Sequence, residues 1–156
     1  MILILGSKKY INDFFNKNIK SKVFVNQHGK KMLSDVNLQF NKSHTENLSI
    51  LMFSKYPCGI DIENIKKYNE LVANKICSEE EKEFLSKINN KDLYFTLLFV
   101  LKESFVKCLG IGISINLRNI SFVKENKINL NIKGYKIDIM HYYNYLIATC
   151  RKVIWK

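Results

Sequence analysis

The sequence contains only one proline and six glycines in 156 residues. This scarcity excludes collagen-like and linker-dominated chains, in which these residue types are abundant. Apolar residues make up 47% of the chain, which is enough material for a hydrophobic core, so we expect a folded protein rather than a disordered one. The length corresponds to one domain.

Long apolar runs are also missing. Residues 97–101 form an unbroken apolar run, but it is far shorter than the roughly 20 residues that a membrane-spanning helix needs. The apolar residues 1–5 are followed at once by a glycine, a serine and two lysines, so no secretory signal is predicted. We therefore expect a soluble cytoplasmic protein with no membrane partner.

The four cysteines form no C-x-x-C pair and no zinc-type pattern with histidine. We expect buried, reduced thiols at all four positions. These positions are Cys58, Cys77, Cys108 and Cys150.

Acidic residues are few: 14 aspartates and glutamates stand against 25 lysines and arginines, which gives a net charge of +11. Such a charge predicts an anionic partner, which could be a nucleic acid, an anionic lipid surface, a phosphorylated cofactor or an acidic protein. The lysines are spread along the whole chain with no arginine-rich block, which argues against a nucleic acid.

Hydrophobic periodicity predicts strands at both ends of the chain and helices in the middle, the pattern of an α+β fold. We expect one helix over residues 10–19, a second that begins with a capping box at Ser78 and Glu81, and a long third helix that ends at Gly110. The expected strands cover residues 1–5, 22–26, 38–41, 48–53, 58–63, 120–124, 128–132, 135–140 and 145–150.

Asp61 and Glu63 alternate with two isoleucines in the strand expected at 58–63. Residues two apart in a strand project from the same face, so these carboxylates point together and repel one another unless a cation lies between them. A divalent cation such as Mg²⁺ is one such partner. The alternative is a solvated strand face.

The long helix expected to end at Gly110 places Phe99, Glu103 and Lys107 on one stripe, because these residues are four apart. The plain interpretation is a salt bridge between Glu103 and Lys107. The functional interpretation is a third metal-binding carboxylate at Glu103 and a phosphate-facing cation at Lys107. Similarly, His44 could bind phosphate beside the basic turn at Gly29-Lys30-Lys31, or serve only in packing. His28 and His141 are expected to be surface or packing residues.

Taken together, these elements resemble the 4'-phosphopantetheinyl transferases, in the branch that activates peptide synthetases and related carrier proteins. The resemblance rests on the order and spacing of Gly29-Lys30, Phe40-Asn41-x-Ser43-His44, Gly59-Ile60-Asp61-Ile62-Glu63, Ser78-x-x-Glu81, Lys102-Glu103-Ser104-x-x-Lys107 and Gly110-x-Gly112. It covers residues 29 to about 122, and the C-terminal strands more loosely.

The resemblance implies transfer of the phosphopantetheine arm of coenzyme A to a serine of an acyl or peptidyl carrier protein, with release of 3',5'-ADP. It implies that Asp61, Glu63 and Glu103 hold Mg²⁺ against the pyrophosphate of coenzyme A. Lys107 would stabilise the charge that develops on the diphosphate. Glu103, or a water beside it, is the candidate base for the carrier serine.

Further site residues follow from the same resemblance. Glu81 is a second candidate base. Lys30, Ser43 and His44 resemble residues that contact the 3'-phosphate and the adenosine part of coenzyme A. Where the family often has tryptophan this chain has Phe99, and Lys31 replaces a common proline.

The fold implied is a single domain over 1–156, with two small similar lobes of antiparallel sheet packed with helices. The N-terminal lobe would cover about 1–56, which is shorter than in typical members of this branch, and the C-terminal lobe would cover about 57–156. We expect a monomer that binds coenzyme A and an acidic carrier protein, and no nucleic acid. The alternatives are an inactive relative, a basic module that binds nucleic acid or an acidic protein without catalysis, and the shorter trimeric enzymes of fatty-acid synthesis, against which the elements before Asp61 argue.

Overall fold

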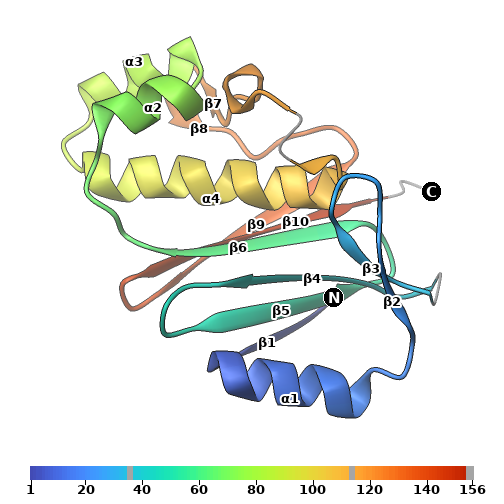
Figure 1. The fold of residues 1–156 in the computed structure, drawn as a ribbon. Helices are drawn as coiled ribbons and strands as arrows, with labels where there is room; N and C mark the ends of the chain where they lie inside the picture. The colour runs from blue at the N-terminus through green and yellow to red at the C-terminus, as the bar shows by residue number, and fades with distance from the viewer. Residues whose placement is uncertain (35–36, 113–114, 154–156) are drawn as a thin grey trace.

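A computed structural model describes residues 1–34, 37–112 and 115–153 of the chain. Two three-stranded antiparallel sheets pack face to face, and helices cover their outer faces (Figure 1). The first sheet has the order β1-β5-β4 and the second the order β6-β10-β9. Each sheet therefore consists of a first, a last and a next-to-last strand of its own half of the chain. The expected α+β fold with two similar lobes is confirmed.

The N-terminal half begins with a strand and a helix that covers the outer face of the first sheet. Its elements are β1 (Ile2–Gly6), α1 (Lys8–Asn18), β2 (Val23–Val25), β3 (Lys31–Leu33), β4 (Gln39–His44) and β5 (Ser49–Ser54). β2 and β3 form a separate two-stranded hairpin. The C-terminal half consists of β6 (Cys58–Asn64), α2 (Glu70–Ile76), α3 (Glu79–Lys87), α4 (Lys91–Leu109), the 3₁₀ turn η2 (Leu117–Asn119), β7 (Val123–Lys124), β8 (Lys127–Ile128), β9 (Tyr135–Tyr142) and β10 (Tyr145–Lys152).

Three clusters of buried side chains correspond to the spaces between these layers. Ile11 of α1 packs with Leu51 and Phe53 on the outer face of the first sheet. Ile60 and Ile62 of β6 lie between the two sheets, as their alternation with acidic residues predicts. The largest cluster joins α4 to the second sheet and to α3. The alternate residues of β6, Gly59, Asp61 and Glu63, therefore project from the opposite face of the strand, toward α4.

The long helix begins and ends where the sequence predicts. Asn90 caps its first turn, and Gly110 ends it in the left-handed conformation with a φ of 71°. At the start of α3, Ser78 and Glu81 form the expected capping box. The strands expected at 120–124 and 128–132 are wrong in extent, because only Val123–Lys124 and Lys127–Ile128 pair there. The sequence does not predict α2 or β3.

All four cysteines are buried free thiols, as expected. Burial raises the pKa of the Cys58 and Cys77 thiols to about 12, which makes them unreactive. Among the described residues, no helix is long and apolar enough to span a membrane.

Candidate active site

β6 carries Asp61 and Glu63 on the face that packs against α4. Gly59 occupies the preceding position on this face, and a Cβ there would lie 2.0 Å from the carbonyl oxygen of Ser104 in α4. Glycine therefore allows β6 and α4 to approach closely at this point. The close approach brings the carboxylates of β6 near the side chains on the adjoining turns of α4.

Asp61 is 4% exposed, and two groups contact one of its oxygens. The Lys107 ammonium lies 2.5 Å from Oδ1, and the Ser43 hydroxyl donates to the same oxygen at 2.7 Å. The other oxygen, Oδ2, is buried and has no hydrogen-bond partner. A buried carboxylate oxygen without a donor is costly unless a cation or a donor satisfies it.

Glu103 lies one turn of α4 before Lys107 and is half-buried. Burial raises the pKa of its carboxyl, Lys107 opposes this rise, and the negative charges of Asp61 and Glu63 add to it. Asp61 and Glu63 are therefore close enough to Glu103 to influence it electrostatically.

Oxygen ligands of this kind suit a hard divalent cation, and the unpartnered Oδ2 of Asp61 fits such an ion. As the side chains stand, no group of three or more histidines, cysteines, aspartates or glutamates in the described ranges converges closely enough to hold one. Glu63 instead pairs with Lys66 at 2.9 Å, and Lys107 supplies the positive charge beside Asp61.

A cavity of about 360 Å³ opens beside these residues. Four lysines and a single carboxylate line it: Lys30, Lys31, Lys42, Lys107 and Glu103. Its walls come from both halves of the chain: the β2–β3 hairpin, β4, the end of α4 and the segment after it. Such a lining favours an anionic ligand.

Lys30 holds the hairpin against the end of α4. Its ammonium donates to the carbonyl oxygens of Cys58 and Lys107 at 2.9 and 2.7 Å, and burial lowers its pKa. The Asn26 amide donates to the carbonyl oxygen of Gly110 at 3.0 Å. The ammonium of Lys30 thus satisfies one backbone carbonyl in the last turn of α4, where a cation is favourable, and one at the start of β6.

The other predicted residues of the N-terminal half are separated from one another. Ser43 is buried against Asp61, whereas His44 lines a different hollow together with Lys8 and Glu63. His28 is exposed, as expected for a surface residue, and it also lines the cavity beside the hairpin turn. The structure therefore brings Lys30, Lys107 and Glu103 to one cavity and leaves His44 outside it.

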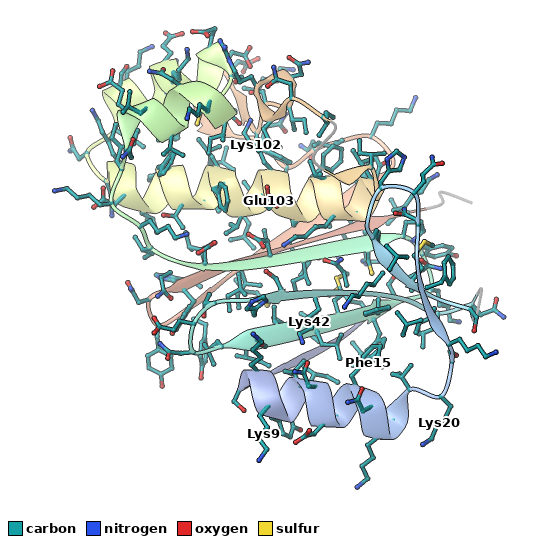
Figure 2. The ribbon with its side chains drawn as sticks, in the orientation of Figure 1. Lys9, Phe15, Lys20, Lys42, Lys102 and Glu103 are labelled. Carbon is teal, nitrogen blue, oxygen red and sulfur yellow. The ribbon has the colours of Figure 1, made fainter. Side chains whose placement is uncertain are left out.

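Glu81 does not reach this cavity. Its side chain is fully buried, and its Oε2 forms an ion pair of 2.7 Å with the equally buried Lys102. Figure 2 shows Lys102 on the side of α4 that faces α2 and α3. The expectation that Glu81 is a second candidate base does not agree with this geometry, because its carboxylate is occupied in the interior and is shielded from any ligand.

Lys42 was missed in the sequence, although it adjoins Ser43. Its ammonium lies 2.5 Å from the Asn12 amide oxygen of α1, between β4 and this helix (Figure 2). Desolvation lowers its pKa, and the positive charges of Lys8 and Lys31 lower it further. The three lysines come from α1, β3 and β4, so no spacing within a single segment reveals that they lie close enough to influence one another.

Known proteins with similar sequences support the family suggested by these motifs. The 4'-phosphopantetheinyl transferases ffp and Sfp of Bacillus subtilis are 36% and 35% identical to this chain over 138 residues, which is 80% of this chain and 60% of each relative. The chain thus spans little more than half of the length of these relatives. A crystal structure of holo-[acyl-carrier-protein] synthase from Thermotoga maritima matches 61% of each chain with a TM-score of 0.50 at 23% identity, a likeness of fold.

The family model described as the 4'-phosphopantetheinyl transferase superfamily matches residues 57–150. This range includes β6 with Asp61 and Glu63 and all of α4 with Glu103 and Lys107. The match covers more than half of the sequence, and the relatives extend the similarity into the N-terminal half. The chain belongs to the 4'-phosphopantetheinyl transferase superfamily.

Proposed function

We propose that this protein transfers the 4'-phosphopantetheine group of coenzyme A to a serine of an acyl or peptidyl carrier protein and releases 3',5'-ADP. The observation that supports this most strongly is the cavity lined by four lysines and Glu103, next to the buried Asp61. Coenzyme A is a polyanion with phosphates at both ends of its nucleotide half. A lysine-lined cavity beside a cluster of carboxylates suits a phosphate group that is bound together with a divalent cation.

Asp61, Glu63 and Glu103 are the residues that would hold Mg²⁺. When bound, this ion would neutralise charge on the pyrophosphate during transfer. The lone Oδ2 of Asp61 fits such an ion, and the mutual influence of the three carboxylates is consistent with it. Lys107 would bind the diphosphate from the opposite side, within reach of Asp61.

Glu103 is our candidate base for the carrier serine, directly or through a water molecule. Burial and two neighbouring carboxylates raise its pKa, which brings a carboxylate closer to the range useful for accepting a proton. Because Glu103 lines the lysine-rich cavity and lies close to Asp61 and Glu63, it would be placed to contact both substrates.

Lys31 and Lys42 are the lysines of the cavity best suited to bind the phosphates of coenzyme A, because neither ammonium is tied to a backbone carbonyl by the described contacts. Lys30 would act mainly through the shape of the cavity, since its ammonium holds the hairpin to α4. His44, in the neighbouring hollow with Lys8, would reach coenzyme A only at its periphery.

The carrier protein would approach along the groove beside Glu63. This groove has an apolar floor that includes Phe95 and Phe99, with Lys66 and Lys67 at its side. Carrier proteins are acidic around the modified serine, as the resemblance implies, so a basic rim is complementary to them. We further propose that residues 1–156 act as a single domain, with lobes about 1–56 and 57–156, as a cytoplasmic monomer.

Intact-mass spectrometry of a panel of apo carrier proteins tests this function. Each carrier is incubated with the protein, coenzyme A and Mg²⁺. We expect at least one carrier to gain the mass of one phosphopantetheine group, and no gain when EDTA is present. Coenzyme A binding without transfer to any carrier would indicate an inactive relative. If the protein neither binds coenzyme A nor modifies a carrier, a non-enzymatic basic module would be favoured.

A further inference from the structure

Ser43 differs from the other residues of the predicted nucleotide site, because its side chain is hydrogen-bonded to a carboxylate and does not line the cavity. It is 6% exposed and does not line the cavity that holds Lys30 and Lys107. Its hydroxyl donates to Asp61 Oδ1 at 2.7 Å. We infer that Ser43 is a positioning residue, which fixes Asp61 so that Oδ2 is left free for the cation.

The backbone around Ser43 makes it a rigid anchor. Ser43 pairs with Ile50 in the β4–β5 ladder. Two residues earlier on the same face of β4, the Asn41 side chain accepts a hydrogen bond of 2.9 Å from the backbone N–H of Ile60. Asn41 and Ser43 thus attach the first sheet to β6 at consecutive positions, Ile60 and Asp61. The strand pairing and these two contacts fix the position of the Ser43 hydroxyl beside the Asp61 carboxylate, and its hydrogen bond restricts the rotation of that carboxylate.

The hydrogen-bond donors around Asp61 are distributed unequally over its two carboxylate oxygens, which leaves one oxygen available to a cation. Oδ1 receives both the Ser43 hydroxyl and the Lys107 ammonium, and Lys107 also lies 3.4 Å from the Ser43 oxygen. Oδ2 receives no donor although it is buried. Groups that hydrogen-bond to metal ligands orient them and stabilise the bound ion, and their loss typically weakens metal affinity by roughly 10- to 100-fold.

This inference rests on the proposed function, since it assumes that Asp61 binds a cation. It also differs from the role that the resemblance implies for Ser43, which is contact with coenzyme A. The two roles predict losses in different equilibria. If Ser43 is a positioning residue, loss of its hydroxyl weakens metal binding in the absence of coenzyme A. If Ser43 contacts coenzyme A, the same loss weakens coenzyme A binding in the absence of metal.

The test compares the wild-type protein with two variants: Ser43→Ala removes the hydroxyl, and Ser43→Thr retains it. Ser49→Ala is the matched control: Ser49 is a buried serine of the adjoining strand whose hydroxyl has no partner. Mn²⁺ alone is titrated into each protein and followed by electron paramagnetic resonance, and coenzyme A binding is measured by calorimetry in EDTA. The Mg²⁺ dependence of transfer provides a third readout.

We expect Ser43→Ala to bind Mn²⁺ roughly 10- to 100-fold more weakly than wild type. Ser43→Thr should bind within a few-fold of wild type, and so should the control. Coenzyme A affinity in EDTA should be unchanged, and kcat at saturating Mg²⁺ should recover. Unchanged Mn²⁺ affinity in Ser43→Ala, or a loss confined to coenzyme A binding, would overturn the positioning role alone. A wild-type protein that binds no Mn²⁺ would overturn both this role and the proposed metal site.

Discussion

Replacement of Glu81 by glutamine should destabilise the protein strongly, because Glu81 is one half of a fully buried ion pair. Its Oε2 accepts hydrogen bonds from the Ser78 backbone N–H and from Lys102, at 2.9 and 2.7 Å. Its Oε1 accepts a hydrogen bond from the backbone N–H of Phe122 at 2.9 Å. Lys102 in turn donates to the backbone carbonyl oxygens of Leu117 and Ile120. The pair thus joins α3, α4 and the segment that follows α4.

The magnitude follows from the charge that the substitution leaves behind. Glutamine has nearly the shape of glutamate, but it leaves the ammonium of Lys102 in the interior without a counter-charge. Removal of one partner of a buried pair costs about 3–5 kcal/mol of unfolding free energy. For a chain of this length, such a loss lowers the melting temperature by roughly 6–20 °C.

Equilibrium unfolding in urea, followed by circular dichroism, measures the effect. Glu79→Gln is the control, because Glu79 lies on the same helix but forms only exposed ion pairs. The free energy of unfolding of this variant should be close to that of wild type. In a double-mutant cycle with Lys102→Met, the combined loss should be clearly smaller than the sum of the single losses. Wild-type stability in Glu81→Gln would refute this reasoning, and if transfer were abolished as well, Glu81 would regain its place as a candidate base.

Three further outcomes are expected. Gly59→Ala should lower the free energy of unfolding in urea by roughly 3 kcal/mol, because the new methyl group would clash with the backbone of α4. An unchanged free energy of unfolding would mean that β6 and α4 lie farther apart. Lys31→Ala combined with Lys42→Ala should raise the Kd for coenzyme A in calorimetry, whereas Lys124→Ala should not, because Lys124 is an exposed residue of β7 that does not line the cavity. Equal affinities would remove Lys31 and Lys42 from the ligand site. Added salt should lower kcat/KM for the carrier protein, and Lys67→Glu with Lys75→Glu should reproduce this loss at low salt; insensitivity to salt would exclude electrostatic steering of the carrier.

The features that the sequence predicts well depend on contacts within one segment. The period of apolar residues and the terminal glycine define α4, and the alternation of Ile60 and Ile62 with acidic residues defines β6. The capping box at Ser78 follows from two residues three apart. The grouping of the carboxylates of β6 with Glu103 came from the family resemblance, and their electrostatic coupling is consistent with it.

What escapes prediction depends on how distant segments pack. The ion pair between Glu81 and Lys102 joins two helices whose own periodicities give no sign of it. Ser43 was assigned to the nucleotide by resemblance, and only the contact between β4 and β6 reveals its bond to Asp61. Lys42 lines the cavity because the edge of the first sheet meets the end of α4, an arrangement that no spacing in the sequence shows.

The central claim is that the cluster of carboxylates beside the lysine-lined cavity carries out phosphopantetheine transfer. The most direct measurement quantifies holo-carrier protein by intact mass and 3',5'-ADP by chromatography in the same reaction, for wild type, Asp61→Asn and Glu103→Gln. The account predicts equal amounts of the two products with wild type, and neither product with the two variants, although both remain folded. Transfer by either variant at close to the wild-type rate, or formation of 3',5'-ADP without holo-carrier protein, would contradict it.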